Sequence, residues 1–184
     1  MVTNEEVFEA IRRGYNDLAN ASDEEIIEYF EGLDEESLQG HISNIKGILF
    51  EEEYVDFLSS QGIDAEMFEE TNHPISDIAI YEDGEVVEEI QLKATDSVSY
   101  INETLAENPD IAIVTTSEVA SKFEDNENII DGRIENEELT DEVVSSLEVE
   151  DVVSDSIAKE VVGTAVAAKI GLPIGIGWLI GLPF

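Results

Sequence analysis

The chain has 184 residues, with 45 Asp and Glu against 8 Lys and Arg, a formal net charge of -37 and 42% hydrophobic residues. The apolar content suffices for one core of ordinary size, which excludes a disordered acidic tail. This length predicts one domain of roughly 120 to 150 residues with appendages. The absence of cysteine excludes disulfides, thiolate zinc sites and cysteine nucleophiles.

Acidic residues are spread through nearly every segment, whereas lysine is scarce. This composition resembles that of haloarchaeal proteins, for which molar KCl shortens the Debye length to about 3 Å and screens the self-repulsion. In such a solvent the negative charge does not exclude a nucleic-acid partner. The first residues, MVTNEEVFEA, have no basic start and no apolar run, which predicts a protein of a high-salt cytoplasm.

The pattern along the chain predicts three regions. They are a helical N-terminal region over residues 1–40, an α/β domain over residues 41–150, and an apolar, glycine-rich C-terminal tail over residues 151–184. No internal repeat divides the chain further.

Helix-start signals mark the N-terminal region. Thr3 with Glu6, and Ser22 with Glu25, have the spacing of a capping box, which predicts two short helices. Apolar residues at helical spacing then predict a longer amphipathic helix from Gly40, ended by Gly62.

Strand-like segments follow this helix. Three strands are expected, at residues 65–69, 75–81 and 85–94. Asp83-Gly84 between the last two is a strong signal for a tight hairpin turn. Asp96 is expected to cap a helix, and the apolar run Ile111–Thr116 predicts a buried strand. The predicted order is therefore helix, strand, strand, strand, helix, strand.

Residues 117–150 are expected to contain a short helix, a polar loop and a last helix. Thr140 is a suitable N-cap for that helix, and Asp141 and Glu142 place negative charge in its first turn.

Four polar side chains are candidates for catalysis: Glu51, Asp77, Gln91 and Lys93. Gln91 and Lys93 are two residues apart and share one face of a strand. Asp77 interrupts an apolar strand, where a buried carboxylate requires a partner or a metal. Oxygen atoms of Asp77, Glu51 and Gln91 suit Mg²⁺ or Mn²⁺, and Lys93 is suited to orient or deprotonate an attacking water. The alternative is a structural ion pair between Lys93 and Asp77.

Three runs carry a resemblance to a known family: ILFEEEYVDFLSSQGID, HPISDIAIYEDGEVVEEIQLKA and IAIVTTSEVA. Over residues 46–120 they resemble the PD-(D/E)xK restriction-endonuclease-like superfamily, in particular its Mrr-type branch. The resemblance implies an αβββαβ core and Mg²⁺-dependent cleavage of DNA.

The resemblance also assigns residues to motifs. Glu51 matches the helix glutamate of the family, Asp77 the aspartate of the second strand, and Gln91 with Lys93 the Gln-x-Lys form of the third motif. The sequence departs from the family at Ser76, where the motif has proline, and at Gln91, which replaces an acidic residue.

The apolar tail is most pronounced over residues 161–184. A membrane-spanning helix needs about 20 apolar residues, and Pro173 and Lys169 interrupt this segment. We expect the tail to be buried against the domain or docked on a protein partner, with membrane insertion as the alternative.

The leading functional hypothesis is a metal-dependent nuclease of a halophile, acting on DNA or RNA, as a defence, mobile-element or toxin effector. The scarcity of lysine and arginine argues against it, because nucleases usually present a basic groove. The second hypothesis is a nuclease fold without turnover that its C-terminal tail docks into an assembly. The third is a membrane-active toxin in which the tail inserts into the bilayer.

Overall fold

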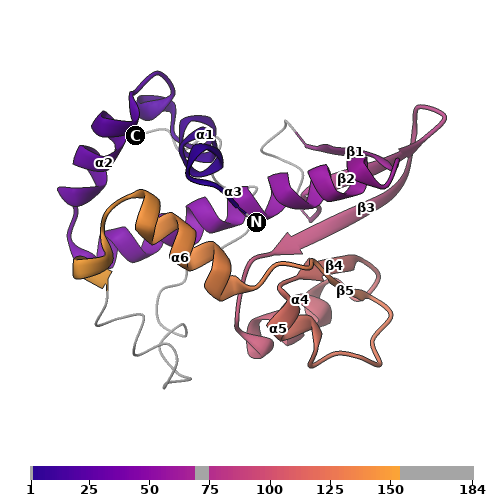
Figure 1. Ribbon diagram of the computed structural model, residues 1–184. Coiled ribbons are helices and arrows are strands. Elements are labelled where there is room, and N and C mark those ends of the chain that lie inside the picture. The colour runs from indigo at the N-terminus through magenta and orange to yellow at the C-terminus, as the bar shows by residue number, and fades with distance from the viewer. Residues whose placement is uncertain (1, 69–74, 154–184) are drawn as a thin grey trace.

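The structure is a computed structural model that describes residues 2–68 and 75–153. Within these ranges the chain forms one mixed sheet of five strands with helices on both faces (Figure 1), which confirms the predicted α/β class. The strands are β1 (Asp64–Met67), β2 (Ile78–Glu82), β3 (Glu85–Lys93), β4 (Ala112–Thr115) and β5 (Ile129–Asp131). The helices are α1 (Asn4–Gly14), the 3-10 turn η1 (Asn16–Leu18), α2 (Asp23–Glu31), α3 (Glu35–Ser60), α4 (Val98–Glu107), α5 (Ser117–Ala120) and α6 (Asn136–Ser146).

The strands follow one another across the sheet in the order of the chain. β1, β2 and β3 pair antiparallel, whereas β4 and β5 continue the sheet parallel to β3. The predicted hairpin is confirmed: Asp83 and Gly84 have φ of 53° and 82°, the positive values that a tight two-residue turn requires. Because β3, β4 and β5 are parallel, their carboxyl ends lie along the same edge of the sheet.

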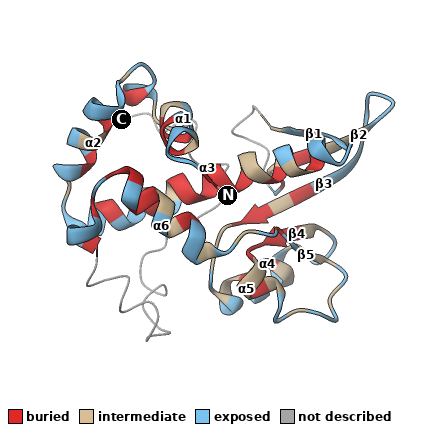
Figure 2. Cartoon of the chain, viewed as in Figure 1, coloured by how far each residue is buried: buried red, intermediate tan, exposed pale blue. Residues whose placement is uncertain are grey.

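Apolar side chains bury both faces of the sheet. The larger cluster joins Ile90, Leu92 and Val114 to the buried face of α3 and to the N-terminal helices. A smaller cluster around Ile101 and Ile113 lies between the sheet and α4 and α5. Burial increases along β3 from its exposed hairpin end to its carboxyl end (Figure 2), so the end that carries the candidate residues is enclosed.

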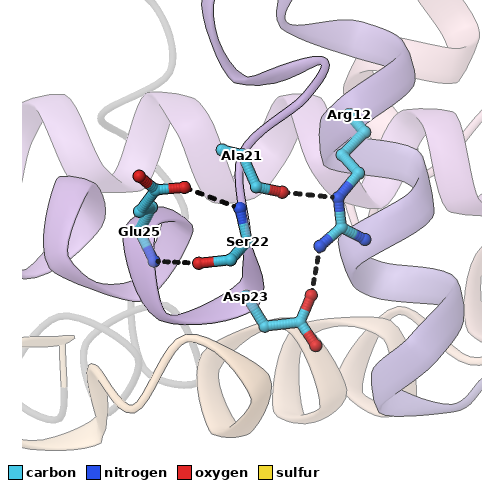
Figure 3. A network of polar contacts seen from close by, with 5 residues as sticks. All are labelled: Arg12, Ala21, Ser22, Asp23 and Glu25. Carbon is cyan, nitrogen blue, oxygen red and sulfur yellow. Dashed lines mark hydrogen bonds and ion pairs between the residues drawn. The ribbon is translucent and has the colours of Figure 1, made fainter.

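The N-terminal helices are fixed by local polar contacts. Both predicted capping boxes are present, at Thr3 and at Ser22. Arg12 of α1 donates a hydrogen bond from Nε to the carbonyl oxygen of Ala21, 2.9 Å away, and its guanidinium pairs with Asp23 (Figure 3). These contacts fasten the start of α2 to α1.

Helix α3 starts earlier than expected, at Glu35 instead of Gly40. The carboxylate of Asp34 accepts a hydrogen bond from the main-chain nitrogen of Ser37 at 3.0 Å and caps the helix. The N-cap of α4 is Ser97 and not Asp96, since the Ser97 hydroxyl accepts from the nitrogen of Tyr100 at 3.2 Å.

The predicted N-cap of the last helix, Thr140, was wrong. Thr140 lies inside α6, where its hydroxyl donates to the carbonyl of Asn136 at 2.8 Å. The helix instead begins at Asn136, whose main-chain nitrogen donates to Glu118 of α5 at 2.7 Å. Strand β5, expected as part of a polar loop, also went unpredicted. Both features depend on residues distant in sequence.

The part of the tail from residue 154 onward, which holds the apolar segment 161–184, lies outside the described residues, so its docking and its insertion in a membrane stay predictions. Across residues 2–68 and 75–153, none of the helices combines the length and the apolar character that crossing a bilayer demands.

Gly132, after β5, allows α3 to pack closely on the sheet. A Cβ atom at this position would lie 2.4 Å from Cζ of Phe50 and 3.0 Å from the carbonyl oxygen of Thr115. Phe50 is fully buried and directly precedes Glu51, so the contact helps to set where the middle of α3 lies on the sheet.

We expect Gly132→Ala to lower the free energy of unfolding by about 2 kcal/mol, because the added methyl group overpacks the core at Phe50. Gly40→Ala is the matched control: Gly40 is in α3 with no neighbour within 4 Å of an added Cβ. It should raise stability by about 1 kcal/mol through helix propensity. Thermal unfolding of both variants in molar KCl measures the difference, and equal melting temperatures would contradict the packing assignment.

Candidate functional site

The four candidate side chains come from α3, from the start of β2 and from the end of β3. Glu51 lies on the buried side of α3, Asp77 directly precedes β2, and Gln91 and Lys93 lie in the last part of β3. The structure brings Asp77 and Lys93 together: Lys93 Nζ lies 4.0 Å from Asp77 Oδ2, and the side chains are 4% and 7% exposed respectively. This ion pair is largely shielded from solvent.

Asp77 is held by both of its neighbouring strands. Its main-chain nitrogen donates to the carbonyl of Ile90 at 2.9 Å, and its carbonyl accepts from the nitrogen of Phe68 at 3.1 Å. The side chain then accepts from the nitrogen of Leu92 at 2.7 Å. The Asp77 carboxylate thus accepts a main-chain hydrogen bond from β3 just before β2 begins. Its position is therefore fixed by the fold.

Glu51 belongs to the same electrostatic group. It is 7% exposed, and burial followed by the charge of Asp77 raises the pKa of its carboxyl well above the usual value. Arg13 and Lys93 act in the opposite direction and lower this pKa. The structure therefore couples Glu51 to Asp77 and Lys93, although they come from segments distant in sequence.

Lys93 is buried without a hydrogen-bond acceptor. Burial lowers the pKa of its amine, and the charges of Asp77 and Glu51 raise it again in part. Among the described residues, Nζ has no hydrogen-bond partner. Burying an amine without a hydrogen-bond acceptor lowers the stability of the fold. Residues in functional sites often carry such a cost.

Gln91 occupies the same face of β3 as Lys93, as expected from their spacing. In the parallel pairing with β4, Gln91 lies beside Ile113 and Lys93 beside Thr115. The Oε1 atom of Gln91 is buried and forms no hydrogen bond within the part of the chain that the structure describes. It is thus an oxygen acceptor available for a ligand.

The donor chemistry of this group fits a hard divalent cation. Glu51 and Asp77 supply carboxylates and Gln91 supplies an amide oxygen, all of the type that Mg²⁺ and Mn²⁺ bind. Within residues 2–68 and 75–153, no cluster of three or more His, Cys, Asp or Glu is arranged to hold a metal. A cation here would therefore depend on Gln91, or on water, for its third ligand.

Two more residues interact electrostatically with this group: the sequence favoured a packing role for Tyr100 over a place lining the site, and it gave no prediction for Arg13. Tyr100, in the first turn of α4, has a pKa raised by burial and then by the charge of Asp77. Arg13 of α1 acts on the charge of Glu51 and pairs with Glu52 at 2.8 Å. No motif marks either residue. The one available signal was that arginine occurs only three times in this acidic chain.

Most basic side chains of the described residues are occupied by internal contacts. Arg12 and Arg13 form ion pairs, Lys93 faces Asp77, and Lys46 donates to Asn136 and Thr140 at 2.8 and 2.9 Å. Lys122 and Arg133 are exposed and form no ion pair within the described ranges. The described surface consequently offers few cations to a polyanion.

Comparisons with models of known protein families, with curated proteins and with solved structures find no match to this chain. The site must therefore be interpreted from its own geometry.

Glu51→Gln should raise the melting temperature of the metal-free protein by a few degrees at neutral pH. The folded pKa of Glu51 is raised, so between the ordinary value of 4.5 and that raised value the folded state binds more protons than the unfolded state. Stability then falls as pH rises through this window, and an uncharged side chain avoids the loss. The gain should shrink as pH is lowered toward 4.5.

Asp56→Asn is the control for that measurement, because it removes one unit of charge from an exposed position of the same helix. Thermal unfolding in EDTA over a pH series compares the two variants. A lower melting temperature for Glu51→Gln at neutral pH would show that the fold depends on the charged carboxylate.

Proposed function

We propose that the chain is a metal-dependent nuclease that hydrolyses phosphodiester bonds in DNA, with RNA as a further substrate. The observation that carries this proposal is the buried amine of Lys93, 4.0 Å from Asp77 and without a hydrogen-bond acceptor among the described residues. A lysine with a purely structural role usually donates hydrogen bonds, as Lys46 does to Asn136 and Thr140.

The order of elements supports the same proposal. From α3 to β4 the chain follows the order helix, three strands, helix, strand. Its first three strands are antiparallel, and β4 is parallel to β3. This is the αβββαβ order that the resemblance to restriction-endonuclease-like proteins implies, and we propose that the domain belongs to that fold.

Glu51, Asp77 and Gln91 are the residues that would hold Mg²⁺ or Mn²⁺. When bound, the cation would stabilise the negative charge that develops on the phosphoryl group during hydrolysis. Burial, and then the charge of Asp77, raises the pKa of Glu51, and a cation held by both carboxylates would offset both effects.

Lys93 would act on the attacking water. Because burial lowers the pKa of its amine, Lys93 loses its proton more readily than an exposed lysine, and a neutral amine can accept a proton from water. Once protonated, the ammonium group would offset negative charge at the phosphate. Asp77, fixed by the nitrogen of Leu92 at 2.7 Å, would keep the amine in position.

One observation favours a second candidate, a nuclease-like fold without turnover. Lys93 already forms an ion pair with Asp77, and the described surface offers few free cations. In this case the pair serves the fold, and the protein acts by docking into an assembly through the segment 161–184. Cleavage assays separate the two candidates.

We expect the full-length protein to cleave plasmid DNA, single-stranded DNA or RNA in molar KCl with Mg²⁺ or Mn²⁺. Lys93→Ala and Asp77→Ala should each lower the rate at least about 100-fold, the usual effect of losing a general base or a metal ligand. Lys122→Ala removes the same charge as Lys93→Ala from an exposed position and should cleave like the wild type.

EDTA should abolish the cleavage, and thermal unfolding should show that each variant is folded. An absence of cleavage on all substrates by folded wild-type protein would reject the nuclease proposal. The same rate for Lys93→Ala and the wild type would place the activity at another site.

A further inference from the structure

Arg133 presents an exposed guanidinium on an aromatic support. It lies in the loop between β5 and α6, with its guanidinium carbon 4.7 Å from the centre of the Phe57 ring of α3. Within the described ranges it forms no ion pair with any carboxylate, in a chain of net charge -37. The Phe57 ring covers one face of the guanidinium. The N–H donors at the edge of the guanidinium remain available to bind another group.

The loop holds Arg133 in an unusual backbone conformation. Its φ is 65°, in the left-handed region that a residue with a side chain rarely adopts. The carboxylate of Asp131 accepts from the nitrogen of Arg133 at 2.8 Å, and Gly132 packs against Phe50 with no room for a side chain. Strain of this kind persists where the surrounding structure enforces it, and it clusters at sites that bind ligands.

The register of the strands relates Arg133 to the candidate site. Lys93 lies beside Thr115, and Thr115 lies beside Asp131, so these residues form one row across three parallel strands. With neighbouring strands about 4.8 Å apart, the backbone of Asp131 lies about 10 Å from that of Lys93. Arg133 follows at the same carboxyl edge of the sheet, where ligands of open α/β sheets usually bind.

We propose that Arg133 binds a phosphate group of the nucleic acid whose scissile bond lies at Lys93. This inference rests on the proposed nuclease function, since it concerns the substrate of that site. The planar guanidinium can donate two parallel hydrogen bonds to one phosphate. A separation of about 10 Å equals the axial rise of about three base pairs, so one strand of a duplex is long enough to reach from Lys93 to this part of the edge. Arg133 therefore supplies a cation that the remaining described surface largely lacks.

The test is equilibrium binding of short fluorescent oligonucleotides, single-stranded and duplex, to the full-length protein in EDTA. Fluorescence anisotropy over a series of KCl concentrations gives the affinity and its salt dependence. Arg133→Gln should weaken binding about tenfold and reduce the slope of log K against log salt by about 1. Arg133→Lys keeps the charge but not the planar guanidinium, so its affinity for the oligonucleotide should lie between those of Arg133→Gln and the wild type.

Lys122→Gln is the matched control, because it removes one exposed positive charge beside Val119 and Phe123 of the smaller cluster, away from Phe57 and the α3 surface that supports Arg133. It should bind like the wild type. Thermal unfolding checks every variant, and Arg133→Lys serves as the readout if Arg133→Gln does not fold.

Three results would overturn the assignment of Arg133: unchanged binding by Arg133→Gln, equal weakening by Lys122→Gln, or no binding by the wild type at any salt concentration. The cleavage assay is independent of these measurements. Binding through Arg133 without cleavage would reject hydrolysis and keep the phosphate contact. Cleavage together with normal binding by Arg133→Gln would reject the phosphate contact alone.

Discussion

The burial of α3 against the sheet is the constraint on which the rest of the structure depends. Apolar residues along this helix pack on the N-terminal helices, on α6 and on the face of the sheet formed by Ile90 and Leu92. The same helix carries Glu51 into the interior and supports Arg133 through Phe57. The positions of the acidic group and of the exposed guanidinium are thus consequences of one packing interface.

The carboxylates of this chain fall into two groups: exposed ones, whose charge the salt solution screens, and buried ones, which the solvent does not reach. Exposed acids are spread over the surface, where salt reduces their repulsion. Glu51 and Asp77 lie where salt has little effect, and the neighbouring cation is Lys93. When Glu51 is ionised, the two buried carboxylates with one amine carry a local excess of negative charge. This imbalance distinguishes the group from the surface acids, and total charge alone does not reveal it.

Local signals in the sequence were sufficient for much of the fold. The capping boxes at Thr3 and Ser22 and the turn at Asp83-Gly84 depend on residues within a few positions of one another. The same reasoning failed for β5 and for the start of α6, which Glu118 caps from another helix. In the site, Lys93 stood out because lysine is rare, and its nearness to Asp77 was anticipated as a possible ion pair. The sequence contained no pattern for Arg133, whose exposure and stacking depend on tertiary packing.

The cap that Glu118 provides for α6 has a consequence for folding. An isolated α6 would lack an acceptor for its first main-chain donors, and nucleating a helix is already unfavourable. Its first turn is completed only when α5 is in place beside β4, which in turn requires the parallel pairing of β4 with β3. Because α6 also packs on α3, the helical half and the sheet half are linked in one cooperative unit. Hydrogen exchange at the first turn of α6 would therefore follow the opening of the sheet.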